Sequence, residues 1–297
     1  PTILDVIGIE HPDAIKGYQA RTGVDVLWRD VAYTFDLKGR QTTTSRLVYR
    51  LHTRNAVEGW GSVEVRHSPW YEEKPEARVR VITADGTAHL LDKKTLSESS
   101  VEKDQKNPLE FHDERITRGP LPAVAPGCVV EEEVVVRDKR PLFEQGTVHS
   151  VKLGHPAPTQ ATRITVSAPV TLPLQYRLLG TALPIEDETK GKLRVLTVAL
   201  GPQKRAPRVP VFLPSDVPRA PALAFSTGKD WQAVARGSHA QVEKKIMPAA
   251  VAKVARELAG DVSSQYIVGC NNLKTMLRLT MPQGANPNGW QVPRATD

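Results

Sequence analysis

Aromatic residues and cysteines are scarce in this chain of 297 residues. Aromatic side chains make up 5% of it, which argues against a platform that stacks the bases of single-stranded nucleic acid. With two cysteines, a disulfide-rich scaffold and a four-cysteine zinc site are both excluded. No apolar run approaches the about 20 residues that a membrane-spanning helix needs, so the sequence predicts no membrane span. Residues 1–18 lack the basic and apolar segments of a secretory signal, so the chain itself contains no targeting signal.

The composition that remains is that of a globular protein. Hydrophobic residues make up 40% and charged residues 25%, and the formal net charge is +7. The basic pairs Lys93-Lys94, Lys204-Arg205 and Lys244-Lys245 are dispersed and lie near acidic residues. A nucleic-acid interface needs a concentrated basic stripe, so no nucleic-acid partner is predicted.

Alternation of apolar and polar residues is the dominant pattern from residue 24 to about residue 200. It begins with Val24, Val26 and Trp28, and it recurs in many short segments that turn residues such as Asp85-Gly86 separate. Alternation places one face of a strand on a core and the other in water. The sequence therefore predicts a mainly β fold: a short N-terminal tail (1–20) followed by an antiparallel β-sandwich domain (21–201).

The pattern changes after residue 201. Six prolines fall between Pro202 and Pro221, which predicts a Pro-rich linker over 202–224 because proline cannot join a central ladder. Helical spacing follows in 225–297, with Ser226 or Thr227 as the predicted cap of a helix that contains Trp231. Two more helices are predicted over 248–258 and, less regularly, over 266–279.

Motifs that carry chemistry are missing from the chain. There is no Gly-x-Ser-x-Gly elbow and no phosphate-binding loop. His149 and His155, with Glu144 nearby, are the closest approach to a ligand cluster, and we interpret them as ordinary loop histidines. The run 131–133 places carboxylates on both faces of one strand, where a solvated face or an internal salt bridge is expected. No catalytic, metal-binding or cofactor-binding residue is therefore predicted.

The two cysteines need separate interpretations. Cys128 begins a valine-rich strand and suits a small apolar position in the core. Cys270 lies in a Gly-Cys-Asn-Asn segment that no histidine follows, so a nucleophile there would need an earlier histidine such as His239 as its base. A disulfide between Cys128 and Cys270 is a further alternative. The role of Cys270 stays open at this stage.

One loop is a candidate binding site. Trp70 and Tyr71 follow Ser68-Pro69 and precede two glutamates. Such an aromatic loop either covers the end of a sandwich or presents a platform for sugars or peptides.

The order of these segments resembles a bacterial family of unknown function that is found N-terminal to transglutaminase-like domains. The segments that carry the resemblance are residues 33–40 with their Gly39-Arg40 turn, Pro69-Trp70, 80–82 leading to Asp85-Gly86, Leu121-Pro122, 126–131, and 225–227 with Trp231. It extends over about residues 24–258. It implies a β-sandwich-type domain and then, in 225–297, the first helices of a truncated transglutaminase-like domain.

The resemblance also implies a function and a location. It implies a non-catalytic accessory or binding module that precedes a papain-like core absent from this chain, with a peptide or cell-envelope polymer as partner, in the periplasm or outside the cell. The superfamily catalyses through Cys, His and Asp, but its Gly-Asp-Cys segment does not occur here and Cys270 does not match it. The alternatives are a cysteine-dependent transglutaminase- or protease-like enzyme and a purely structural interaction module.

Overall fold

The computed structural model describes residues 23–100, 113–206 and 221–246. The chain divides into two compact units, Pro1–Val234 and Ala235–Asp297. All of the strands described below belong to the first unit. The second unit is described only within the last part of one helix.

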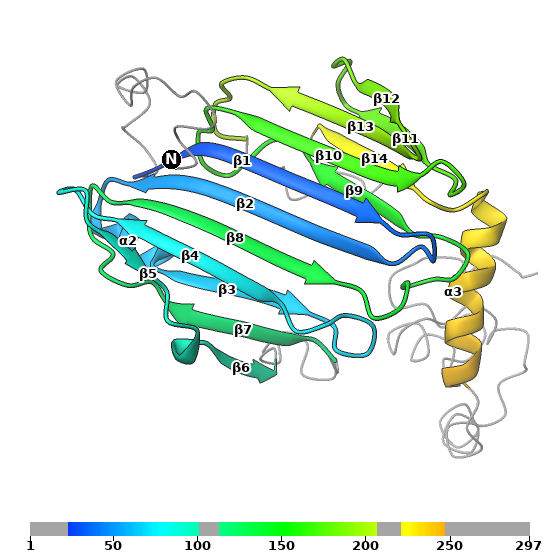
Figure 1. The fold of residues 1–297 in the computed structure, drawn as a ribbon, viewed down its shortest axis with the longest axis horizontal. Coiled ribbons are helices and arrows are strands. Elements are labelled where there is room, and N and C mark those ends of the chain that lie inside the picture. Colours follow the sequence, from blue (N-terminus) through cyan, green and yellow to red (C-terminus); the bar gives the residue numbers. More distant parts are fainter. Residues whose placement is uncertain (1–22, 101–112, 207–220, 247–297) are drawn as a thin grey trace, which may run out of the picture. The chain divides into compact units, whose positions relative to one another are not determined.

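The described part of the chain is built mainly from strands (Figure 1). Its elements are, in chain order, β1 (Val24–Phe35), β2 (Gln41–Leu51), α2 (Arg54–Trp60), β3 (Ser62–His67), β4 (Glu76–Ile82), β5 (Ala88–Leu90), the 3₁₀ turn η2 (Lys93–Thr95), β6 (Ser97–Ser100), β7 (Arg115–Pro120), β8 (Val129–Arg137), β9 (Val148–Lys152), β10 (Thr162–Pro169), β11 (Gln175–Leu179), β12 (Glu186–Lys190), β13 (Leu193–Leu200), β14 (Ala222–Ser226) and α3 (Trp231–Ile246). The predicted mainly β fold class is confirmed.

Eight strands form one large sheet in the order β12-β13-β10-β1-β2-β8-β4-β5. Its pairings are antiparallel except between β1 and β10, which run parallel with Val31 opposite Ile164. A register shift between Val26 and Trp28 places a bulge in β1. The parallel pair joins the first strand of the domain to one more than 100 residues later, so the sheet is not the purely antiparallel one that the sequence predicts.

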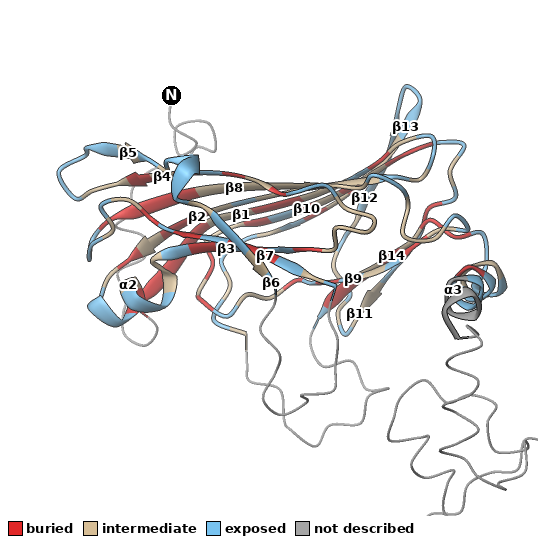
Figure 2. Cartoon of the chain, turned by 90° about the horizontal axis from the view of Figure 1, so that it is seen from below, coloured by how far each residue is buried: buried red, intermediate tan, exposed pale blue. Residues whose placement is uncertain are grey.

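Two three-stranded sheets, β3-β7-β6 and β11-β14-β9, pack on the same face of the large sheet (Figure 2). The first, together with α2, covers a core that includes Val63, Tyr49 and Val130. The second covers a core that includes Phe225, Phe35 and Ile164. We call this covered side the inner face. The large sheet is one layer of the sandwich and the two small sheets form the other, with a core under each small sheet.

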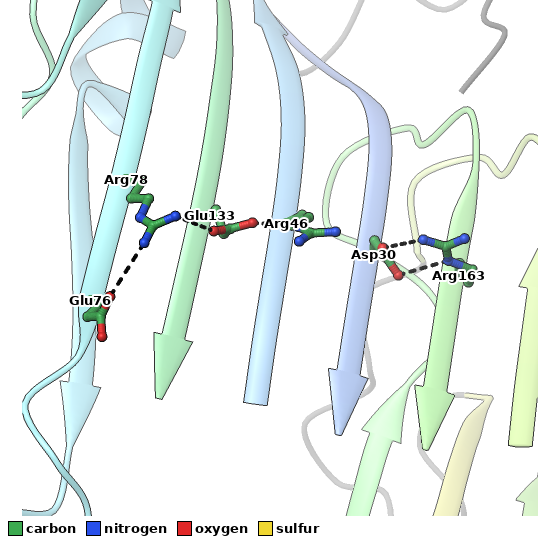
Figure 3. A network of polar contacts seen from close by, with 6 residues as sticks. All are labelled: Asp30, Arg46, Glu76, Arg78, Glu133 and Arg163. Atoms are coloured by element: carbon green, nitrogen blue, oxygen red, sulfur yellow. Dashed lines mark hydrogen bonds and ion pairs between the residues drawn. The ribbon is translucent and has the colours of Figure 1, made fainter. Parts of the chain in front are cut away.

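The outer face of the large sheet carries two groups of ion pairs: one joins β10 to β1, and the other joins β2, β8 and β4 (Figure 3). Arg163 on β10 binds Asp30 on β1 through two hydrogen bonds of 3.1 and 2.6 Å. Arg46 on β2 donates to Glu133 on β8 at 2.6 Å, and Arg78 on β4 lies 3.7 Å from the same carboxylate. The Arg46–Glu133 and Arg78–Glu133 pairs are partly exposed and contribute about 0–1 kcal/mol each, whereas the Asp30 carboxylate is buried.

Several local predictions need correction. The helix α2 interrupts the strands after Thr53, whose side chain accepts from the Ala56 amide as an N-cap. Residues 97–100, a polar segment without apolar alternation, form the edge strand β6. The segment 222–226, divided above between the linker and the helical part, is the central strand of a sheet. Neither Ser226 nor Thr227 caps the helix α3: Asp230 accepts from the Ala233 amide at 2.6 Å.

Other predictions lie outside the described residues. They are the tail 1–20, most of the Pro-rich linker, the helices over 248–258 and 266–279, and Cys270. The helix that contains Trp231 is present.

Candidate functional site

The predicted aromatic loop joins β3 to β4 and is closed by its own hydrogen bonds. The amides of Tyr71 and Glu72 both donate to the Ser68 carbonyl, at 3.1 and 2.8 Å. The Ser68 amide in turn donates to the Glu72 carboxylate at 2.5 Å. The loop is therefore a compact turn whose shape is set by its backbone.

Further bonds attach this loop to the end of β8. The Glu73 amide donates to the Arg137 carbonyl at 2.8 Å, and the Lys139 amide donates to the Tyr71 carbonyl at 2.7 Å. The Lys139 ammonium also donates to the Pro69 carbonyl at 2.8 Å. A segment that follows β8 by sequence thus holds the aromatic loop in place.

The two aromatic rings meet edge to face. Their centroids lie 4.6 Å apart, and the Arg140 guanidinium lies 5.2 Å from the centre of the Trp70 ring. Both side chains are half-buried. Burial and the neighbouring Glu72 carboxylate raise the pKa of Tyr71 to about 12, so its hydroxyl keeps its proton at physiological pH.

A cavity of about 200 Å³ lies beside this loop. Its lining residues come from the end of the large sheet at which β1 and β8 finish and β2 begins, and Figure 1 shows these strand ends. Its walls come from the β1–β2 hairpin, the loop and the end of β8. The lining residues are Thr34, Phe35, Asp36, Arg40, Gln41, Thr42, Glu73, Arg137 and Asp138. Phe35 supplies an apolar wall, and the other side chains are polar or charged.

The lining carboxylates differ in their surroundings. Asp36 accepts from the amides of Lys38 and Arg40 and from the Arg40 guanidinium, and these hydrogen bonds outweigh the effect of its burial and lower its pKa. Asp138 accepts from the Gln41 amide at 2.9 Å, yet its burial dominates and raises its pKa to about 6. Asp138 therefore changes its charge just below neutral pH.

The remaining candidates from the sequence do not form a site. His149 stacks on Phe225 with centroids 5.1 Å apart, whereas His155 packs 5.9 Å from Trp60, so the two histidines belong to different neighbourhoods. Within the described ranges no group of three or more His, Cys, Asp or Glu residues could hold a metal ion. The glutamates of 131–133 do occupy both faces of β8, with Glu132 on the inner face.

Cys128 is fully buried in the core, as expected. A carboxylate–histidine pair lies nearby: Asp25 and His52 are 2.9 Å apart, and Asp25 is almost fully buried. Asp25 alternates with the inner-face residues Val24 and Val26, so it lies on the face opposite the Cys128 side chain. Among the described residues, therefore, no thiol faces the Asp25–His52 pair.

The fold of the described residues is that of a two-layer β protein with a small polar cavity at one end of its large sheet. A family model described as a domain of unknown function with solved-structure structure (DUF3857) matches residues 38–206. The chain belongs to this family. No match is found among the curated proteins.

A solved structure resembles the chain in fold. A putative protease from Parabacteroides distasonis superposes with a TM-score of 0.68 at 15% identity, over 88% of this chain and 49% of that one. The chain thus spans about half the length of that protein. A putative nutrient binding protein from Legionella pneumophila covers 91% of this chain and 89% of its own at 8% identity, with a TM-score of 0.33. For an M1 zinc metallopeptidase from Deinococcus radiodurans the TM-score is 0.31 at 11% identity, over 69% of this chain and 42% of that one. No described helix is long and apolar enough to cross a membrane.

Proposed function

We propose that this chain is a non-catalytic binding module that precedes a transglutaminase-like domain and binds a peptide or a cell-envelope polymer, in the periplasm or outside the cell. The observation that carries the proposal is the aromatic loop with the adjoining cavity of about 200 Å³. A rigid loop with half-buried rings beside a polar hollow offers both apolar contact and hydrogen bonds to an extended ligand.

The arrangement of the described residues favours binding over catalysis. Catalysis by a cysteine needs a thiolate within reach of a base. Cys128 is enclosed in the core, and the Asp25–His52 pair belongs to the opposite face. Family membership and the half-length match to a putative protease support a place in front of another domain.

The test measures binding to the full chain by calorimetry, with soluble peptidoglycan fragments and a short unstructured peptide as separate probes. Trp70→Ala should weaken binding of the preferred probe at least tenfold, because it removes the larger ring of the aromatic pair. Tyr71→Phe, which keeps the ring and removes the hydroxyl, should weaken it less.

Trp231→Ala is the matched control, since Trp231 is another tryptophan of the chain and is 73% exposed. Equal affinities of the Trp70 and Trp231 variants would contradict the proposed site. Absence of binding by every probe would contradict the binding function and favour a structural interaction module.

A further inference from the structure

We propose that the cavity at the end of the large sheet binds the primary ammonium group of a peptide, with Asp138 and Glu73 as its acceptors. This inference rests on the proposed function, since it names the group that the same site recognises.

The charged donors of the wall are already engaged. Arg40 contacts the Asp36 carboxylate through Nε at 2.8 Å and Nη2 at 2.8 Å. Arg137 donates to Glu76 on the neighbouring strand β4 at 2.5 Å. Both guanidinium groups are therefore neutralised by partners within the protein, and neither is left to attract an anionic ligand.

The acceptors of the wall are in surplus. Among the described residues, the Glu73 carboxylate has no hydrogen bond or ion pair, and Asp138 receives only the Gln41 amide. The side-chain oxygen of Gln41, which also lines the cavity, is buried and has no hydrogen-bond partner. These acceptors come from three separate segments and share one cavity. Of these acceptors only the Gln41 oxygen is buried, while the Asp138 carboxylate is half-buried and the Glu73 carboxylate is exposed. A ligand that supplies donors and positive charge to the two carboxylates is therefore favoured.

The geometry favours an organic ammonium over a metal ion. The carboxylates of the wall do not approach one another closely enough to form a metal-binding group within the described ranges. A primary ammonium carries three donors of its own and can bridge acceptors that are farther apart. Phe35 offers an apolar wall for the carbon chain that carries the ammonium.

The source of the ammonium is either a lysine side chain or a peptide N-terminus. Three peptides separate these sources in calorimetric titrations of the full chain. The first is N-acetylated and contains one free lysine. The second is N-acetylated and contains Nε-acetyl-lysine, so it has no ammonium. The third has a free N-terminus and Nε-acetyl-lysine.

Binding of the first or the third peptide at least tenfold tighter than the second supports the proposal and identifies the source. Asp138→Asn should weaken the tighter peptide about tenfold and leave the second unchanged. Glu73→Gln tests the second acceptor independently of the fold, because Glu73 is exposed and unpaired. Asp113→Asn, an exposed acidic residue elsewhere, is the matched control.

Binding should also weaken from pH 7.5 to pH 5, as Asp138 takes up a proton. The titratable and charged groups that face Asp138 are Tyr71 and Glu72 from the loop and Asp36 and Arg40 from the hairpin. Equal binding of all three peptides would overturn the ammonium assignment and leave the binding module intact. If no peptide binds while peptidoglycan fragments do, the ammonium assignment alone is wrong. If nothing binds, both proposals are wrong.

Discussion

Glu132 offers the sharpest test of the packing. It lies on the inner face of β8, directly between Leu47 on β2 and Val79 on β4. No hydrogen bond or ion pair reaches its carboxylate from the described residues. Burial raises its pKa from 4.5 to about 7, so folding favours the protonated form.

The magnitude follows from these two values. Because the folded-state pKa lies above the unfolded one, the stabilising effect of the proton is fully present below pH 4.5 and is lost as pH rises through 7. Each pH unit between the two values is worth about 1.4 kcal/mol, so the total loss by pH 8 is about 3 kcal/mol. For a domain of this size that is roughly 6–12 °C in melting temperature.

Glu132→Gln removes the ionisation. We expect the variant to gain about 3 kcal/mol over the wild type between pH 4 and pH 8, measured by urea denaturation at several pH values. Taking the difference in unfolding free energy between the variant and the wild type cancels the contribution of the histidines, whose ionisation changes stability with pH in the opposite direction. Glu133→Gln is the control. Glu133 faces outward and pairs with Arg46, so this substitution should change the free energy of unfolding by no more than about 1 kcal/mol. A difference between Glu132→Gln and wild type that does not change with pH would refute the reasoning.

Two further predictions test other parts of the domain. Burial, with the nearby Arg29, lowers the pKa of His155 from 6.5 to about 4, so the stability that the neutral ring contributes above pH 6.5 is lost as pH falls towards 4. His155→Gln should therefore reduce the loss of stability between pH 6.5 and pH 4 by about 2–3 kcal/mol, measured by thermal unfolding. Gly146 and Gly39 both have a positive φ, but a Cβ on Gly146 would lie 2.3 Å from the Gly228 amide nitrogen, whereas one on Gly39 would meet nothing within 4 Å. Gly39→Ala should therefore cost about 1 kcal/mol and Gly146→Ala at least about 2 kcal/mol more, and equal losses in urea would show that the close approach is not maintained.

The strands were predictable because their signal is local. Val24 and Val26 alternate with polar neighbours, and the Asp85-Gly86 turn marks its hairpin without reference to the rest of the chain. The helix α2 escaped prediction because its seven residues show little periodicity. Its stability comes from the Thr53 cap and from packing of Ala56 and Trp60 against the core.

The position of each glutamate in 131–133 could not be read from the sequence. Three consecutive carboxylates between valines do not alternate, so either face of the strand could have received Glu132. The register with β2, which places Glu132 opposite Leu47, decides it.

The candidate site likewise combines a part that the sequence predicts with a part that depends on the tertiary structure. The sequence alone determined that Trp70 and Tyr71 share a loop, because they are neighbours in the chain. Asp36, Glu73 and Asp138 come from three distant segments, and no local pattern relates them. They meet only because β2 pairs with both β1 and β8, which brings the hairpin and the end of β8 together at one end of the sheet. Strand alternation is a property of single segments, whereas a cavity depends on long-range pairing, so only the tertiary structure could define it.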